Sequence, residues 1–76
     1  MVSPHDRRYQ ALLKRLREAR VEAGLSQVDV AKRLGLIQPL VSRIESGERK
    51  IDPIEFSELC RLYGKGARYF LPELPV

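Results

Sequence analysis

With 76 residues, the chain is long enough for one small domain, and 14 Lys and Arg residues against 10 Asp and Glu residues give it a net charge of +4. A net positive charge on so small a domain favours an anionic partner, either nucleic acid or an acidic surface. The charge would alternatively serve only to keep the protein soluble. No apolar run approaches the ~20 residues that span a bilayer, residues 1–8 contain no apolar signal-peptide core, and the single Cys60 excludes an internal disulfide. We therefore expect a cytoplasmic protein.

The first predicted element is an amphipathic helix over residues 9–23. Apolar side chains recur there at helical spacing, and Gly24 follows as a stop signal. Residues 1–8 are expected to form a flexible N-terminus. The apolar stripe of this helix consists of Tyr9, Leu12, Leu13, Leu16, Ala19 and Ala23.

A short second helix is predicted over residues 27–34. Ser26 is the expected N-cap, and Asp29, three residues later, would complete a capping box with it. Gly35 then ends the helix, because glycine readily adopts the left-handed conformation of a helix C-terminus.

The third helix is expected to open at Gln38-Pro39 and to run to about Ser46, where Gly47 stops it. Proline is tolerated in the first helical turn, because its missing N–H would have no helical partner there. It also holds the preceding residue extended, which suits Gln38 as the cap.

The fourth helix has the strongest start signal of the chain. Asp52, Pro53 and Glu55 supply a cap, a first-turn proline and the acidic partner of a capping box. Gly64 marks its end, and a last short helix is expected over residues 67–71. Because no segment alternates as a strand does, the fold class predicted is all-α, with five short helices.

The second and third helices are joined by a short turn through Gly35, which predicts a helix-turn-helix. In that motif the second helix of the pair enters the major groove of DNA. Glutamine can bond N6 and N7 of adenine, and arginine can bond O6 and N7 of guanine. Pro39 has no side-chain donor, so it would touch a thymine methyl group or shape the helix start. The predicted base readers are Gln38, Pro39, Ser42 and Arg43.

Residues 16–64, LREARVEAGLSQVDVAKRLGLIQPLVSRIESGERKIDPIEFSELCRLYG, resemble the Cro/repressor-type (Xre) helix-turn-helix domain. The pieces GLSQ, VAKRLG and VSRIESGER carry most of the resemblance. It implies a compact five-helix bundle of the phage-repressor type, which binds operator DNA, usually as a dimer. It also implies that Gln27 contacts a phosphate and that Gln38 with its neighbours reads bases. Ser46 and Lys50 are implied to touch the DNA backbone.

Three residues depart from the family pattern that this resemblance supplies. Ile37 stands where a small polar residue is frequent, Pro39 where a polar base reader is common, and Leu40 where an aromatic is frequent. Fewer bases would then be read through hydrogen bonds.

Phosphate contacts are predicted on both sides of the third helix. The start of the second helix, at Ser26 and Gln27, offers unpaired amides and the positive end of the helix dipole to a phosphate oxygen. Arg49 and Lys50 follow in the next loop, where they would reach a phosphate or form a solvated turn.

A buried ion pair is predicted between Arg20 and Glu45. Arg20 follows Leu13 and Leu16 on the inward face of the first helix, where a guanidinium needs a partner. Glu45 lies one turn after Val41, on the inward edge of the third helix. The family resemblance supports the pairing, and two surface charges are the alternative.

The tail, residues 67–76, brings more apolar side chains than a core this small is expected to absorb. Exposed patches of this kind usually mark an interface. We therefore predict a dimer seam in the tail, although Phe70 and Leu71 would alternatively close the base of the monomer core. The predicted seam consists of Tyr63, Tyr69, Phe70, Leu71 and Leu74.

Together these features predict one helix-turn-helix domain over residues 1–76, a transcriptional regulator or repressor of the bacterial or phage nucleoid. It would bind a near-palindromic double-stranded operator as a homodimer. The alternative is an adaptor or antitoxin that uses the same fold to dock a partner protein. No metal site, cofactor, small-molecule ligand or nucleophile–base set is indicated, and the lone His5 argues against an enzyme.

Overall fold

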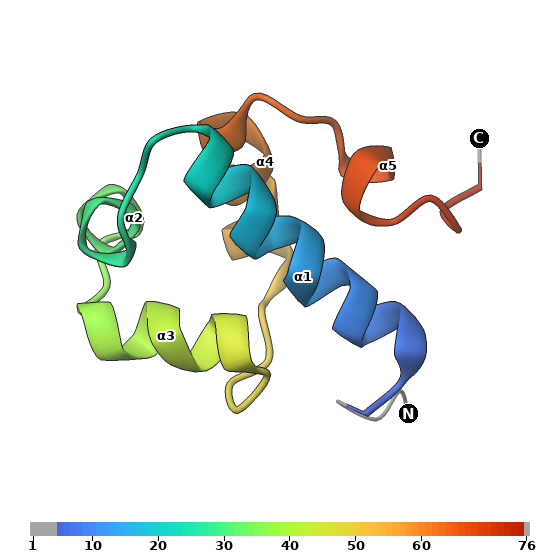
Figure 1. Ribbon diagram of the computed structural model, residues 1–76, viewed down its shortest axis with the longest axis horizontal. Coiled ribbons are helices and arrows are strands. Elements are labelled where there is room, and N and C mark those ends of the chain that lie inside the picture. Colours follow the sequence, from blue (N-terminus) through green and yellow to red (C-terminus); the bar gives the residue numbers. More distant parts are fainter. Residues whose placement is uncertain (1–4, 76) are drawn as a thin grey trace.

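The computed structural model describes residues 5–75 and forms five helices. Figure 1 shows α1 running through the middle of the molecule, with α3 on one side of it and α5 on the other. The described residues contain no strand and no helix long and apolar enough to cross a membrane. The predicted all-α fold is confirmed, whereas Val76 of the predicted tail lies outside the described residues. The helices are α1 (Arg7–Glu22), α2 (Gln27–Leu34), α3 (Gln38–Ser46), α4 (Pro53–Tyr63) and α5 (Ala67–Phe70).

Helix α1 begins two residues earlier than the apolar stripe predicted, because Asp6 caps it. The Asp6 carboxylate accepts a hydrogen bond from the backbone N–H of Arg8 at 2.8 Å, and the Arg8 guanidinium binds the same carboxylate. The side-chain bond from Arg8, followed by its backbone bond, lowers the pKa of Asp6 to about 2. Arg7 and Arg8, predicted as part of a flexible N-terminus, therefore lie in the first turn of α1.

The capping boxes that begin α2 and α4 are present as predicted. Ser26 Oγ accepts from the Asp29 N–H at 3.1 Å, and Asp29 accepts from the Ser26 N–H at 2.9 Å. Asp52 and Glu55 make the same reciprocal pair at the start of α4. Helix α3 differs from the prediction by one residue, because Ile37 rather than Gln38 is its N-cap.

The core lies where α1 meets the other four helices. Phe70 of α5 is fully buried and packs edge-to-face on Phe56 of α4, with ring centroids 5.9 Å apart. Arg15 of α1 fastens α5 further, because its guanidinium donates to the Phe70 carbonyl at 3.1 Å. The main cluster consists of Leu12, Leu16, Ala19, Val30, Ala31, Val41, Leu59, Tyr63 and Phe70.

Gly47 fixes the direction in which the chain leaves α3. Its φ of 89° lies in the left-handed region, which glycine adopts without steric cost. A Cβ atom at this position would also lie 3.1 Å from Cδ1 of Leu13 on α1. A side chain at this position would therefore strain the backbone and require Leu13 to shift by a few tenths of an ångström.

Candidate nucleic-acid interface

Helices α2 and α3 form the predicted helix-turn-helix. Gly35 ends α2 in the left-handed conformation, and the Leu36 N–H donates back to the Ala31 carbonyl at 2.8 Å. Ala31 of α2 and Val41 of α3 are both buried in the main cluster. This packing fixes the inner side of α3 and leaves the outer side of the helix facing solvent.

The predicted ion pair between Arg20 and Glu45 is present, and it fastens α3 to α1. Arg20 Nε lies 2.7 Å from Glu45 Oε2, and the two side chains are 16% and 6% exposed. Arg20 also donates to the Leu25 carbonyl at 3.0 Å, so it holds the α1–α2 loop as well. Arg17, which the sequence did not single out, donates to the Glu45 carbonyl at 2.7 Å.

A chain of side-chain hydrogen bonds leads from this ion pair to the start of α3. Gln27 Nε2 donates to Glu45 Oε1 at 3.0 Å, and Gln38 Nε2 donates to Gln27 Oε1 at 2.7 Å. A carboxylate only accepts, so Glu45 must face the amino group of Gln27, whose carbonyl oxygen then faces Gln38. Gln38 consequently keeps one N–H donor and its own carbonyl acceptor for a ligand.

This role of Gln27 was not foreseen from the sequence, which predicted a phosphate contact. Its side chain is half-buried and occupied by Glu45 and Gln38. Its backbone N–H lies in the first turn of α2, where a helix provides no internal acceptor. A phosphate contact by Gln27 therefore remains a prediction for the backbone, while its side chain positions Gln38.

The other predicted base readers lie on the outer side of α3. Pro39 and Arg43 are exposed, and Ser42 is half-buried. Arg43 Nε is 3.8 Å from Glu48 Oε2, and both side chains are mostly exposed, so this pair is loose. Ser46 donates to the Arg43 carbonyl at 3.1 Å, which makes its hydroxyl a cap for the end of the helix.

Arg49, predicted to reach a phosphate or to form a solvated turn, pairs with a carboxylate of α4. Its guanidinium binds Glu55 through two hydrogen bonds, of 2.9 and 2.8 Å. The hydrogen bond raises the pKa of Arg49 and lowers that of Glu55. Arg49 thus fastens the α3–α4 loop to α4, whereas its neighbour Lys50 is exposed. The phosphate contacts predicted for Arg49 and Lys50 remain predictions.

Two residues of the predicted dimer seam are buried inside the monomer. Phe70 is fully buried and Tyr63 is nearly so, and burial raises the pKa of the Tyr63 hydroxyl. Neither offers a surface to a second chain, because α5 inserts Phe70 into the core beside α1 and α4. The sequence left open an alternative in which Phe70 and Leu71 close the base of the core, and Phe70 has this place while Leu71 is half-buried and packs against the cluster.

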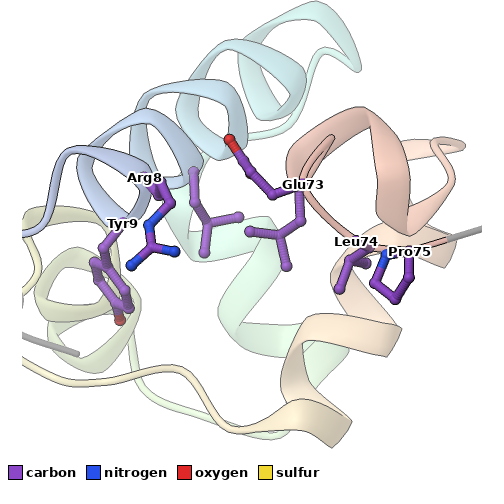
Figure 2. Close-up of a pocket in the computed structure, with 7 residues that line it drawn as sticks. Arg8, Tyr9, Glu73, Leu74 and Pro75 are labelled. Carbon is purple, nitrogen blue, oxygen red and sulfur yellow. The ribbon is translucent and has the colours of Figure 1, made fainter. Parts of the chain in front are cut away.

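The rest of the tail folds back against the start of α1 and leaves an apolar pocket of about 230 Å³. Figure 2 shows Tyr9 on α1 and Leu74 and Pro75 in the tail as parts of its wall. Tyr69 and Leu74 are 45% and 39% exposed, and Leu71 is half-buried. These side chains form the exposed part of the tail surface.

Comparisons with known proteins agree with the fold and with the motif. A family model described as helix-turn-helix, HTH_3, matches residues 16–70. The solved structure of an XRE-family like protein from Pseudomonas syringae pv. tomato str. DC3000 is similar, with a TM-score of 0.79 and 46% sequence identity. The similarity covers 91% of this chain and 84% of that chain. No curated protein matches.

Proposed function

Because the chain belongs to the Cro/repressor-type (XRE) helix-turn-helix family of DNA-binding regulators, we propose that it is a sequence-specific transcriptional repressor. Helix α3 is its recognition helix and lies in the major groove of double-stranded DNA. The protein binds a near-palindromic operator as a homodimer, at the bacterial or phage nucleoid. The observation that carries this proposal is the chain of hydrogen bonds that orients Gln38.

Gln38 is assigned to an adenine of the operator. Adenine presents an N6 donor and an N7 acceptor in the major groove, and a glutamine amide can bind both at once. The carbonyl oxygen of Gln38 and its second N–H are the two groups that this contact requires. Since Gln27 already fixes the amide, less side-chain freedom is lost on binding.

The experiment that tests the proposal is selection of bound sites from random duplex DNA, followed by affinity measurements on the selected site. A regulator should recover one near-palindromic sequence. The logarithm of its association constant should fall linearly with the logarithm of the salt concentration, with a slope of about 0.9 per phosphate neutralised. A protein-docking adaptor with the same fold would instead bind DNA weakly and without sequence preference.

Replacing either Gln38 or Gln27 should reduce discrimination between bases at the same position of the operator. Gln38→Ala is expected to reduce discrimination there by ~1–3 kcal/mol, and Gln27→Ala should weaken it because the amide of Gln38 is no longer held. The double variant should lose no more than Gln38→Ala alone, since the two residues act as a unit. Affinities for operators changed at that base pair measure the effect. Unaltered discrimination in Gln27→Ala would rule out a positioning role.

Variants of Arg43 and Lys50 should change DNA binding in different ways, because one residue is expected to contact a base and the other a phosphate. Arg43→Ala is expected to relax preference at one base pair, by ~1–3 kcal/mol. Lys50→Ala should weaken binding to all DNA sequences alike, and it should reduce the slope of log affinity against log salt concentration by about one. Salt titrations on specific and unrelated duplexes measure both. If Arg43→Ala behaves as Lys50→Ala does, Arg43 contacts the DNA backbone and reads no base.

A further inference from the structure

The apolar pocket beside the tail is built by the two ends of the described chain. After Phe70 the tail makes a turn in which the Leu74 N–H donates to the Leu71 carbonyl at 3.1 Å, and this turn faces the start of α1. The sequence did not indicate this pocket, because its walls come from opposite ends of the chain. The lining residues, shown in Figure 2, are Arg8, Tyr9, Leu12, Leu71, Glu73, Leu74 and Pro75.

The size of the pocket and its walls decide which kind of occupant fits. A cavity of about 150 Å³ lined by apolar side chains holds one benzene molecule. A pocket of about 230 Å³ therefore holds a flat molecule of roughly nine non-hydrogen atoms. An α-helix, about 10 Å across, is too wide for it. Because most of the wall is apolar, the occupant must be mostly hydrocarbon.

The charged residues of the wall limit the charge that this occupant can carry. Arg8 is already paired with Asp6, whose carboxylate accepts from Nε at 3.0 Å and from Nη2 at 2.9 Å. Glu73 lies close enough to Arg8 to interact with the same positive charge. One guanidinium thus stands against two carboxylates, and a carboxylate can only accept hydrogen bonds. An anionic occupant is therefore disfavoured, and an uncharged molecule with a hydrogen-bond donor is favoured.

Tyr9 connects the pocket to the loop that follows α3. Its ring lines the pocket, whereas its hydroxyl accepts a hydrogen bond from the Ile51 N–H at 3.3 Å. Ile51 directly follows Lys50, for which a phosphate contact is predicted. A molecule that packs on the Tyr9 ring therefore restrains the tail on one side and the α3–α4 loop on the other.

We propose that the pocket is an effector site for a compact, uncharged molecule with a flat apolar body and one hydrogen-bond donor for Glu73, and that Tyr9 transmits its binding to the α3–α4 loop. The site follows from the pocket alone, whereas its effect on DNA rests on the proposed function. The bound molecule stabilises the arrangement in which Tyr9 holds Ile51, so it raises operator affinity. Operator DNA raises the affinity for the molecule by the same factor.

Indole is the probe for the site, because it is flat, uncharged and of the required size, and carries an N–H donor. Titration of the full chain with indole should give saturable shifts of the backbone amide NMR signals at the start of α1, in the tail and at Ile51. Indole-3-carboxylate adds a negative charge and should bind roughly ten-fold more weakly. Glu73→Gln should reduce this difference between the two probes. Glu58→Gln, which changes an exposed carboxylate on α4 outside the pocket, should preserve it.

The role of Tyr9 is tested with the operator obtained by selection. Saturating indole should raise the operator affinity of the native protein roughly five-fold, which is the lower end of typical couplings between sites. Tyr9→Phe keeps the ring on the pocket wall and removes the hydroxyl. This variant should bind indole as the native protein does, but the Ile51 amide signal should no longer respond, and indole should leave its operator affinity unchanged.

The inference and the proposed function fail in different ways. Indole that does not bind, or binds no better than its carboxylate, would overturn the site. Indole that binds without changing operator affinity, or acts equally on Tyr9→Phe, would overturn the role of Tyr9. Indole that binds only as the dimer dissociates in sedimentation would assign the pocket to a side chain of the second copy and overturn the proposal. A protein that binds indole but has no DNA sequence preference would remove the proposed function and leave the site.

Discussion

Replacing Arg20 with alanine should destabilise the domain by roughly 3–5 kcal/mol, because it leaves a buried carboxylate without its counter-charge. The Glu45 side chain is only 6% exposed, and Gln27 alone would remain as its side-chain partner. The bond from Arg20 to the Leu25 carbonyl would also be lost. Small domains have a total stability of roughly 5–15 kcal/mol, so the variant should be largely or partly unfolded at 37 °C. Thermal and urea denaturation followed by circular dichroism measure the loss.

Two further variants show whether the buried charge causes this loss. Arg8→Ala breaks the ion pair with Asp6 on the surface of α1, and it should lower the melting temperature little. Replacing Arg20 and Glu45 together with methionine and leucine should recover much of the stability, because no unpaired charge remains. That double variant should still lose discrimination at the Gln38 position, since Gln27 is no longer oriented. A melting temperature of Arg20→Ala equal to that of the native protein would contradict the argument.

The parts of the fold that the sequence predicted well depend on short-range signals. The capping boxes at Ser26 and Asp52 each involve residues three positions apart, so local chemistry alone sets where α2 and α4 begin. The ion pair of Arg20 with Glu45 could be predicted from the sequence, because a buried guanidinium requires a partner and the apolar spacing identified the inward faces of the helices. Asp6 was missed as a cap, because the apolar stripe begins at Tyr9 and gives no sign of an earlier start.

The parts that the sequence did not predict depend on how the helices cross. The bond between Gln27 and Glu45 joins residues 18 positions apart on different helices, and no local pattern indicates that they meet. Arg49 lies beside Lys50 in a loop-like stretch, and its pairing with Glu55 competes with the phosphate contact that charge alone favours. Phe70 was counted as surplus apolar surface because the size of the core depends on the docking of α5 against α1. For the site, therefore, the outer face of α3 was predictable, whereas the groups that orient Gln38 were not.

We expect the dimer to depend on the exposed part of the tail. Of the changes predicted for this protein, loss of the dimer should reduce operator affinity the most. Tyr69 and Leu74 remain exposed after the buried residues are excluded, and the apolar pocket beside Leu74 extends the surface. A twofold dimer sets two recognition helices about one DNA turn, ~34 Å, apart. Linking two half-site contacts in this way typically raises affinity by roughly 10²–10⁴-fold.

Replacing Tyr69 and Leu74 together with glutamate should therefore give a folded monomer that binds the operator about 10²–10⁴-fold more weakly. Deleting the tail from Arg68 onward would be a poorer test, because it removes Phe70 from the core. Sedimentation at micromolar concentration and operator titrations measure assembly and affinity, and Val21→Glu is the control, since Val21 is an exposed apolar residue on α1. A tail variant that stays dimeric would place the seam elsewhere. A native protein that is monomeric both free and on its operator would show that each half-site is bound independently, without a dimer.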